Sequence, residues 1–213
     1  MDLYFSPMAC SLATRITLYE ANADANFIQV DTKKKRVADG TDFYAVSPLG
    51  QVPVLRTNDG WLLTENTAIL PYVADQFPHA HLMPPAGTAE RAKAQQWLGF
   101  ISTELHKAVF VPLLDPGASE DVLNYTRKRV PLRLAVLDAH FAANAFLLER
   151  FTVADAYLAT VLNWAQYSGV SLAAWPSVEA YYRRIAQRPA VAKALAEEMA
   201  LYLEEQAREK AAA

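Results

Sequence analysis

Hydrophobic and polar positions follow two different patterns along the chain. Up to about Pro78, short apolar runs bounded by turn residues alternate with helical periodicity. Strands are predicted over residues 3–5, 27–30, 52–55 and 61–63, with Asn58-Asp59-Gly60 as a hairpin turn between the last two. Helical spacing begins at Ser11 and again at Glu65-Asn66, where Asn66 is the predicted N-cap. The order of elements indicates a small α/β domain.

Beyond a proline-rich linker at residues 78–87, the apolar spacing is helical almost throughout. One stripe contains Trp97, Ile101 and Leu105, and Thr152 with Asp155 forms a capping-box pattern before another apolar run. We therefore predict an α/β domain over residues 1–78 and an all-α domain over residues 88–205. The segment after Leu203 is charged and rich in alanine, and we expect it to fray.

Composition narrows the classes of function. The chain has 213 residues, of which 53% are hydrophobic and 20% charged, with a formal net charge of −3. This excludes a disordered chain and gives no general attraction to nucleic acid or to an anionic membrane. No apolar run has the roughly 18 residues that span a bilayer, and the start lacks a secretory signal, so we expect a cytoplasmic protein.

Cys10 is the single cysteine, which excludes an internal disulfide and any zinc site with two or more thiolates, and we expect no metal. In a Cys-x-x-Cys motif that begins at Cys10, the second cysteine would stand at position 13, which is Ala13. This excludes a dithiol oxidoreductase. Cys10 lies at the start of a predicted helix, where free N–H groups stabilise a thiolate. The alternative is a small buried hydrophobic residue.

Two further places in the chain, each at the start of a predicted strand or helix, are candidates for ligand binding. The Val52-Pro53 bond precedes a strand, and in a cis form it would leave the Val52 backbone able to pair with an extended peptide. Glu65 and Asn66 lie at a strand-to-helix junction, where a carboxylate, an amide and free N–H groups suit the charged ends of an amino acid. Simple helix capping is the alternative for this pair.

The helix around His106 has a mixed polar and aromatic face away from its main apolar stripe. At about 100° per residue, Thr103, His106 and Phe110 lie opposite that stripe, and Glu104 points about 160° away from His106. Either one of the two side chains is merely on the surface, or they serve the sites of different subunits.

Six segments, taken together and in this order, resemble the cytosolic glutathione S-transferases, and in particular the bacterial beta class. They are residues 7–13, 47–53, 58–75, 103–107, 151–158 and 188–191. The resemblance extends from Met1 to about Met199. It implies a thioredoxin-like α/β N-terminal domain followed by an all-α C-terminal domain, assembled as a homodimer.

The resemblance also implies a glutathione site in the N-terminal half. Pro53 would be cis and Val52 would pair with the cysteinyl backbone of glutathione. Glu65 would hold the γ-glutamyl ammonium group and Asn66, where the class generally has serine, its carboxylate. Lys35 would face the glycyl end.

Further site residues follow from the same resemblance. Cys10 and His106 would lie near the glutathione sulfur as the catalytic residues. Thr103 and Glu104 would contact glutathione, with Glu104 reaching that of the partner subunit. Phe110 and Trp164 would belong to the wall of the electrophile pocket.

The implied activity is detoxifying conjugation of glutathione, activated as a thiolate, to small hydrophobic electrophiles. Glutathione is then a co-substrate, and no other cofactor is expected. Cys10 offers a second use, because a mixed disulfide with glutathione would give thiol-disulfide exchange resolved by a second glutathione. Alternatives are a glutathione-dependent isomerase, dehalogenase or lyase, and a binding protein of the same fold without catalysis.

Overall fold

The computed structural model describes residues 1–212 and divides them into two compact units. The first unit comprises Met1–Leu82 together with the stretch from Arg188 onward, and the second comprises Met83–Gln187. The last helix therefore belongs with the N-terminal strands, whereas the predicted range 88–205 places most of it in the helical domain. No helix within residues 1–212 has both the length and the apolar character needed to cross a bilayer.

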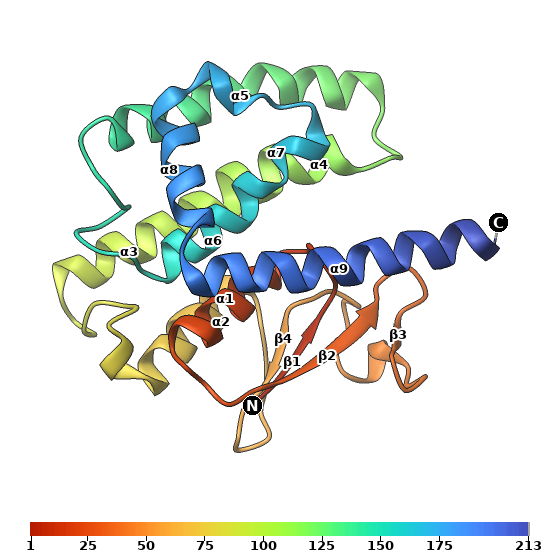
Figure 1. Ribbon diagram of the computed structural model, residues 1–213. Helices are drawn as coiled ribbons and strands as arrows, with labels where there is room; N and C mark the ends of the chain where they lie inside the picture. Colours follow the sequence, from red (N-terminus) through yellow and green to blue (C-terminus); the bar gives the residue numbers. More distant parts are fainter. Residues whose placement is uncertain (213) are drawn as a thin grey trace. The chain divides into compact units, whose positions relative to one another are not determined.

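The first unit is built on a five-stranded mixed sheet in the order β3-β2-β1-β4-β5 (Figure 1). Its strands are β1 (Asp2–Phe5), β2 (Asn26–Asp31), β3 (Arg36–Val37), β4 (Val54–Arg56) and β5 (Leu62–Thr64). The central strand β1 is parallel to β2, with Leu3 opposite Phe27, and antiparallel to β4, with Leu3 opposite Leu55. This mixed sheet and its helices confirm the thioredoxin-like α/β domain.

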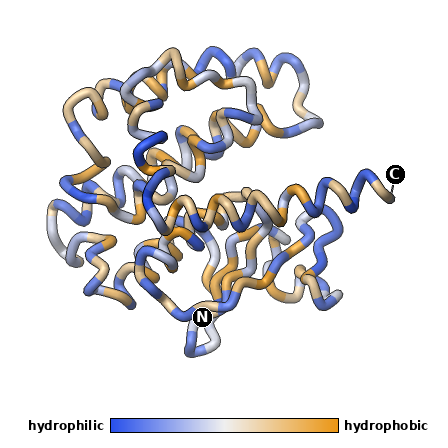
Figure 2. The backbone as a smooth tube through the Cα atoms, viewed as in Figure 1, coloured by the Kyte–Doolittle hydropathy of each residue, from blue (hydrophilic) through white to orange (hydrophobic). Residues whose placement is uncertain are grey.

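Alternation along β1 gives the sheet two hydrophobic faces. Leu3 and Phe5 belong to one buried cluster with Leu55, whereas Tyr4 belongs to another with Val54. Figure 2 shows hydrophobic residues along these strands and more hydrophilic ones in the loop that joins β4 to β5. The predicted hairpin at residues 58–60 is confirmed, because β4 and β5 pair in antiparallel register.

The first unit also contains helices α1 (Leu12–Glu20) and α2 (Asn66–Gln76), with short 3₁₀ turns η1 (Phe43–Ala45) and η2 (Pro78–Ala80). The prediction that Asn66 caps α2 is wrong by one residue. Glu65 is the N-cap, at φ 67°, and Asn66 is the first helical residue. The Asn66 side chain is therefore not a cap and is available for a contact with another element.

Helix α9 (Pro189–Ala212) lies alongside α1 and belongs to the same unit (Figure 1). The stretch after Leu203, which was expected to fray, is helical as far as Ala212. Side chains four residues apart on α9 meet the region of β2. Gln29 donates to Glu205 across 2.7 Å, and the Lys33 ammonium group lies 2.7 Å from Glu209.

The second unit is helical. Its elements are α3 (Ala89–Phe100), the π-helix η3 (Ile101–Phe110), α4 (Val111–Leu114), α5 (Glu120–Phe141), α6 (Val153–Asn163), α7 (Ala165–Ser168), the 3₁₀ turn η4 (Leu172–Ala174) and α8 (Pro176–Ala186). The all-α prediction for this part is confirmed. The predicted capping box at the start of α6 is present, with the Thr152 N–H donating to Asp155 across 2.9 Å.

The π-helix is the local feature that periodicity did not predict. The Val111 N–H at its end donates to the His106 carbonyl, five residues earlier. A wider helix turns through a smaller angle per residue, so the faces assigned at about 100° per residue do not hold over 101–110. His106 is buried here together with Ile101 and Leu105.

Candidate active site

Cys10 lies in the turn between β1 and α1, two residues before the first helical residue, Leu12. The turn is fixed by its own polar groups. The Ser11 hydroxyl donates to the Ser6 carbonyl across 3.2 Å and accepts the Ser6 N–H across 3.3 Å. Met8 adopts a positive φ of 61° within the same turn. Cys10 is thus held at the N-terminal end of α1, as the sequence predicts.

The Cys10 side chain is partly exposed and its thiol donates to the Val52 carbonyl across 3.2 Å. The alternative of a fully buried structural cysteine is therefore wrong. The Val52-Pro53 bond is cis, as the resemblance implies. The structure thus brings the thiol to the Val52 carbonyl, two residues before β4. The expected pairing with a peptide ligand depends on this stretch of backbone.

Asn66 connects the start of α2 to the Cys10 turn. Its Nδ2 donates to the Cys10 carbonyl across 2.9 Å, and its Oδ1 accepts the Thr14 hydroxyl across 3.0 Å. The Asn66 side chain is only 4% exposed. The preceding Glu65 is exposed at the N-terminal end of α2. Of this predicted pair, Asn66 is therefore buried and hydrogen-bonded within the protein, whereas Glu65 is exposed to solvent.

Lys35 is joined to the loop that precedes Val52. Its ammonium group donates to the Gly50 carbonyl across 2.9 Å. Gly50 has a φ of 59°, and a Cβ there would lie 2.9 Å from a ring carbon of Tyr44 and 3.0 Å from Cδ of Lys35. Only glycine suits both this backbone conformation and this close approach.

A buried carboxyl group contacts the turn that carries Cys10. Glu198 of α9 has no exposed surface, and it accepts the Met8 N–H across 2.7 Å. Its Oε1 lies 3.3 Å from Nε of Arg15. Burial raises the pKa of the Glu198 carboxyl to about 8, and the Arg15 guanidinium and the Met8 N–H oppose this rise.

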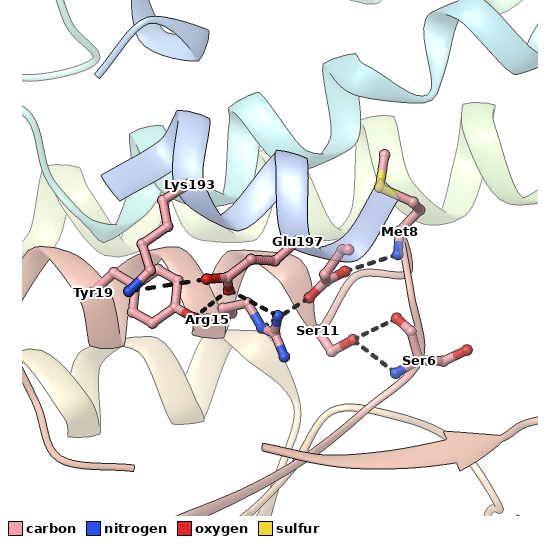
Figure 3. Close-up of polar contacts among 8 residues, drawn as sticks. Ser6, Met8, Ser11, Arg15, Tyr19, Lys193 and Glu197 are labelled. Carbon is pink, nitrogen blue, oxygen red and sulfur yellow. Dashed lines mark hydrogen bonds and ion pairs between the residues drawn. The ribbon is translucent and has the colours of Figure 1, made fainter. Parts of the chain in front are cut away.

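The same charge cluster extends along α1 and α9 (Figure 3). The Arg15 guanidinium lies 3.4 Å from Glu197 and stacks 4.3 Å from the centre of the Phe5 ring. Tyr19 donates its hydroxyl to Glu197, and burial together with this bond raises the pKa of Tyr19 to about 12. Helix α9 thus supports the turn that carries Cys10.

In the second unit, His106 lies in an aromatic cluster. Its Nδ1 is 2.6 Å from the Tyr157 hydroxyl, and its ring centre is 5.0 Å from that of Trp164. Phe110 contacts the same Trp164 at 6.2 Å between ring centres. The aromatic neighbours fit the predicted mixed polar and aromatic face of His106, and the residue is buried, at 7% exposure.

Burial lowers the pKa of His106 to about 4, and the Lys107 charge adds to the decrease. The imidazole is therefore neutral at neutral pH. Nδ1 is paired with the Tyr157 hydroxyl, and Nε2 is the ring nitrogen left for another hydrogen bond.

Thr103 and Glu104 lie on the same π-helix with different partners. The exposed Thr103 donates its hydroxyl to the Gly99 carbonyl across 3.0 Å. Glu104 accepts two hydrogen bonds from Arg133, at 2.7 and 3.0 Å, and Arg129 lies 3.9 Å away. Arginine side chains of α5 thus balance the Glu104 charge.

The predicted site residues form two groups, one in each unit. Cys10, Val52 and Asn66 are in direct contact in the first unit, and His106, Phe110 and Trp164 form the cluster of the second. Sequence reasoning did not single out four supporting residues: Thr14, Arg15, Tyr157 and Glu198. The signal in the sequence is an arginine within the apolar periodicity of α1, which indicates a buried partner.

Comparisons with known proteins agree with this architecture. The family model for the glutathione S-transferase N-terminal domain matches residues 1–75, and the model for the C-terminal domain matches residues 100–189. Glutathione S-transferase GstA of Escherichia coli O157:H7 is 42% identical over 203 residues, which cover 93% of this chain and 98% of that protein.

Two solved structures are similar over nearly their whole length. A bacterial beta-class glutathione S-transferase from Sphingomonas chungbukensis has a TM-score of 0.89 and 43% identity, with 93% of this chain and 98% of that chain covered. A sphingomonad glutathione S-transferase complexed with glutathione has the same TM-score of 0.89, identity of 43% and coverage of 93% and 98%. With a thioredoxin-like sheet, a helical second unit and both family models matched in order, the chain belongs to the glutathione S-transferase family.

Proposed function

We propose that this protein is a glutathione transferase that activates glutathione as a thiolate for conjugation to small hydrophobic electrophiles. The observation that carries the proposal is the position of Cys10. Its thiol lies at the N-terminal end of α1, 3.2 Å from the carbonyl of Val52, which precedes a cis proline. A ligand thiol bound beside Cys10 would share the partial positive charge of the helix end.

Conjugation requires little more than a stabilised thiolate. The glutathione thiol gives up its proton to water, and its sulfur then forms a bond to the electrophilic carbon. When the electrophile is a chlorinated dinitrobenzene, chloride leaves with the electron pair of its bond to carbon. His106 is neutral at neutral pH, so it would act on the sulfur through a hydrogen bond from its ring and not through charge.

The glutathione-binding roles in the first unit are part of this proposal. The exposed Glu65 would hold the γ-glutamyl ammonium group, and the N-terminal end of α2 at Asn66 its carboxylate. Val52 and Pro53 would present the backbone that pairs with the cysteinyl residue. Lys35, held by the Gly50 carbonyl, would face the glycyl end.

The roles in the second unit are also proposed. Thr103 and Glu104 would contact glutathione, with Glu104 reaching the site of a partner subunit in a homodimer. Glu104 is held by Arg133, which fixes the carboxylate and fits such a role. Phe110 and Trp164 would form the apolar wall that receives the electrophile, as part of a cytoplasmic detoxifying enzyme.

Cys10 favours a second activity on the same site, thiol-disulfide exchange. The Cys10 thiolate would attack a glutathionylated thiol, form a mixed disulfide with glutathione and release the substrate as a thiolate. A second glutathione thiolate would then attack the mixed disulfide, giving oxidised glutathione and free Cys10. The partial exposure of the cysteine supports access to the thiol.

The test compares both activities in the wild type and in Cys10→Ala. We expect the wild type to bind immobilised glutathione and to conjugate a chlorinated dinitrobenzene. Loss of disulfide exchange alone in Cys10→Ala would assign the cysteine to redox exchange. Unchanged rates in both assays would contradict its proposed role, and failure of the wild type to bind glutathione would overturn the transferase proposal.

A further inference from the structure

The contact between His106 and Tyr157 is a buried pair that joins η3 to α6. The Tyr157 hydroxyl lies 2.6 Å from Nδ1 of His106, and Tyr157 is only 2% exposed. The rings meet edge to face at 5.9 Å. The Trp164 ring also packs against the imidazole, with 5.0 Å between ring centres, so two aromatic side chains contact the ring.

The chemistry of the pair decides which group donates. A phenol O–H is a more acidic donor than the N–H of a neutral imidazole, and the unprotonated imidazole nitrogen is a stronger acceptor than a phenol oxygen. The separation of 2.6 Å is shorter than the usual 2.9–3.0 Å of an N–H donor and closer to the distances of hydroxyl donors. Both points favour donation from the Tyr157 hydroxyl to Nδ1.

We propose that Tyr157 is a positioning residue that holds His106 in the tautomer protonated at Nε2. The second ring nitrogen is then a neutral N–H donor with a fixed direction. Which nitrogen of a histidine carries the proton is set by the hydrogen bond that the other one makes. The use of this donor toward a glutathione thiolate rests on the proposed function, whereas the tautomer itself does not.

The test is a two-bond ¹H–¹⁵N correlation spectrum of the full-length protein labelled at histidine nitrogens, with His106 assigned by comparison with His106→Gln. We expect the wild type to show the Nε2–H pattern at neutral pH. In Tyr157→Phe, which keeps the ring and removes the hydroxyl, we expect His106 to shift toward a mixture with the Nδ1–H tautomer. In the same variant, kcat for conjugation should fall about tenfold, the size of one hydrogen bond, with KM for glutathione unchanged.

Tyr182→Phe is the matched control. Tyr182 also lies in the second unit, and its hydroxyl donates to Asn163 across 2.7 Å. Removal of that hydroxyl should leave the His106 pattern and kcat as in the wild type. A change in the His106 pattern of Tyr182→Phe equal to that of Tyr157→Phe would overturn the proposal, because the effect would then be general to the unit.

Two further results would overturn it. One is an Nδ1–H pattern in the wild type, a measurement that needs no variant to fold. The other is an unchanged Nε2–H pattern in folded Tyr157→Phe. If the tautomer shifts as expected but the wild type conjugates no electrophile, the positioning role of Tyr157 stands and the proposed function fails.

Discussion

The amide of Asn66 donates to the carbonyl of Cys10 across 2.9 Å, and so ties the first turn of α2 to the turn that carries the thiol. The same amide accepts the hydroxyl of Thr14 from the first turn of α1. Both contacts are buried or partly buried, so neither is easily replaced by water. Asn66 therefore fixes the position of Cys10 through the backbone and not through its sulfur.

Replacing Asn66 with alanine should destabilise the first unit. The Thr14 hydroxyl would lose its acceptor in a buried site, and the Cys10 carbonyl would lose one donor. We expect a loss of about 1–3 kcal/mol in the free energy of unfolding, measured by chemical denaturation. Asn26→Ala is the control, because Asn26 also donates its amide to a side chain, Asp2, but is exposed.

The loss in Asn26→Ala should be below about 0.5 kcal/mol. Equal losses in the two variants would show that the Asn66 contacts contribute no more than a surface hydrogen bond. Thr14→Val in the background of Asn66→Ala should then cost less than in the wild type, since the two groups share one bond.

Features that depend on neighbouring residues in the chain were predictable from the sequence. The hairpin at residues 58–60 and the capping box of Thr152 and Asp155 depend on residues close together in the chain, and both are present. The cis form of Val52-Pro53 and the thioredoxin-like domain followed from resemblance and not from the local pattern.

Long-range pairing was not predictable in the same way. Glu198 and Met8 are 190 residues apart, and a charged residue near a chain end is usually solvated. An aromatic face for His106 was predictable but its burial was not, because the helix changes from α to π at Ile101, which alters the direction of the side chains that follow. Asn66 was expected as a cap because the start of α2 was placed one residue late.

Alanine and glutamine at position 198 should lower the free energy of unfolding by different amounts, because only glutamine keeps an acceptor for the Met8 N–H. At pH 6 the Glu198 carboxyl is protonated, so alanine removes a neutral acceptor of the Met8 N–H in a buried site, and we expect a loss of about 1–3 kcal/mol in unfolding free energy. Glutamine keeps an acceptor for the Met8 N–H and resembles the protonated carboxyl, so its loss should be smaller. Equal losses at pH 6 would contradict this account.

The stability of Glu198→Gln should also differ in its pH dependence. The pKa of Glu198 is raised from 4.5 in the unfolded chain to about 8, so the folded state binds a proton that the unfolded state releases. Its contribution to stability is complete below pH 4.5 and is lost as the pH rises through about 8. Denaturation curves from pH 5 to 9 should show a smaller decrease in the variant.

His106 should lower the stability of the folded protein as the pH decreases, whereas Glu198 lowers it as the pH increases. Its pKa falls from 6.5 to about 4 on folding, so the unfolded chain binds the proton first as the pH decreases. The difference corresponds to a loss of about 3 kcal/mol in unfolding free energy between pH 6.5 and 4.

His106→Gln should lack this component, whereas His79→Gln, at an exposed position, should keep it. Denaturation midpoints measured across that pH range provide the comparison. Identical slopes for His106→Gln and the wild type would show that the buried imidazole does not resist protonation.

Gly50 and Gly60 provide a matched pair for testing the loop that holds Lys35. Both have a positive φ, 59° and 85°, so alanine strains the backbone at either position. Only at Gly50 would the new Cβ meet neighbours, at 2.9 Å from the Tyr44 ring and 3.0 Å from Lys35, whereas at Gly60 nothing lies within 4 Å. We expect Gly60→Ala to lose about 1 kcal/mol in unfolding free energy and Gly50→Ala about 1–3 kcal/mol more.

The same pair tests the proposed role of Lys35. The Cβ of Gly50→Ala would displace the Lys35 side chain from the Gly50 carbonyl, and with it the charge that is proposed to face the glycyl end of glutathione. Titration calorimetry should therefore show weaker glutathione binding in Gly50→Ala and unchanged binding in Gly60→Ala. If both variants bind glutathione as the wild type does while Gly50→Ala is destabilised as expected, Lys35 supports the loop and does not contact the ligand.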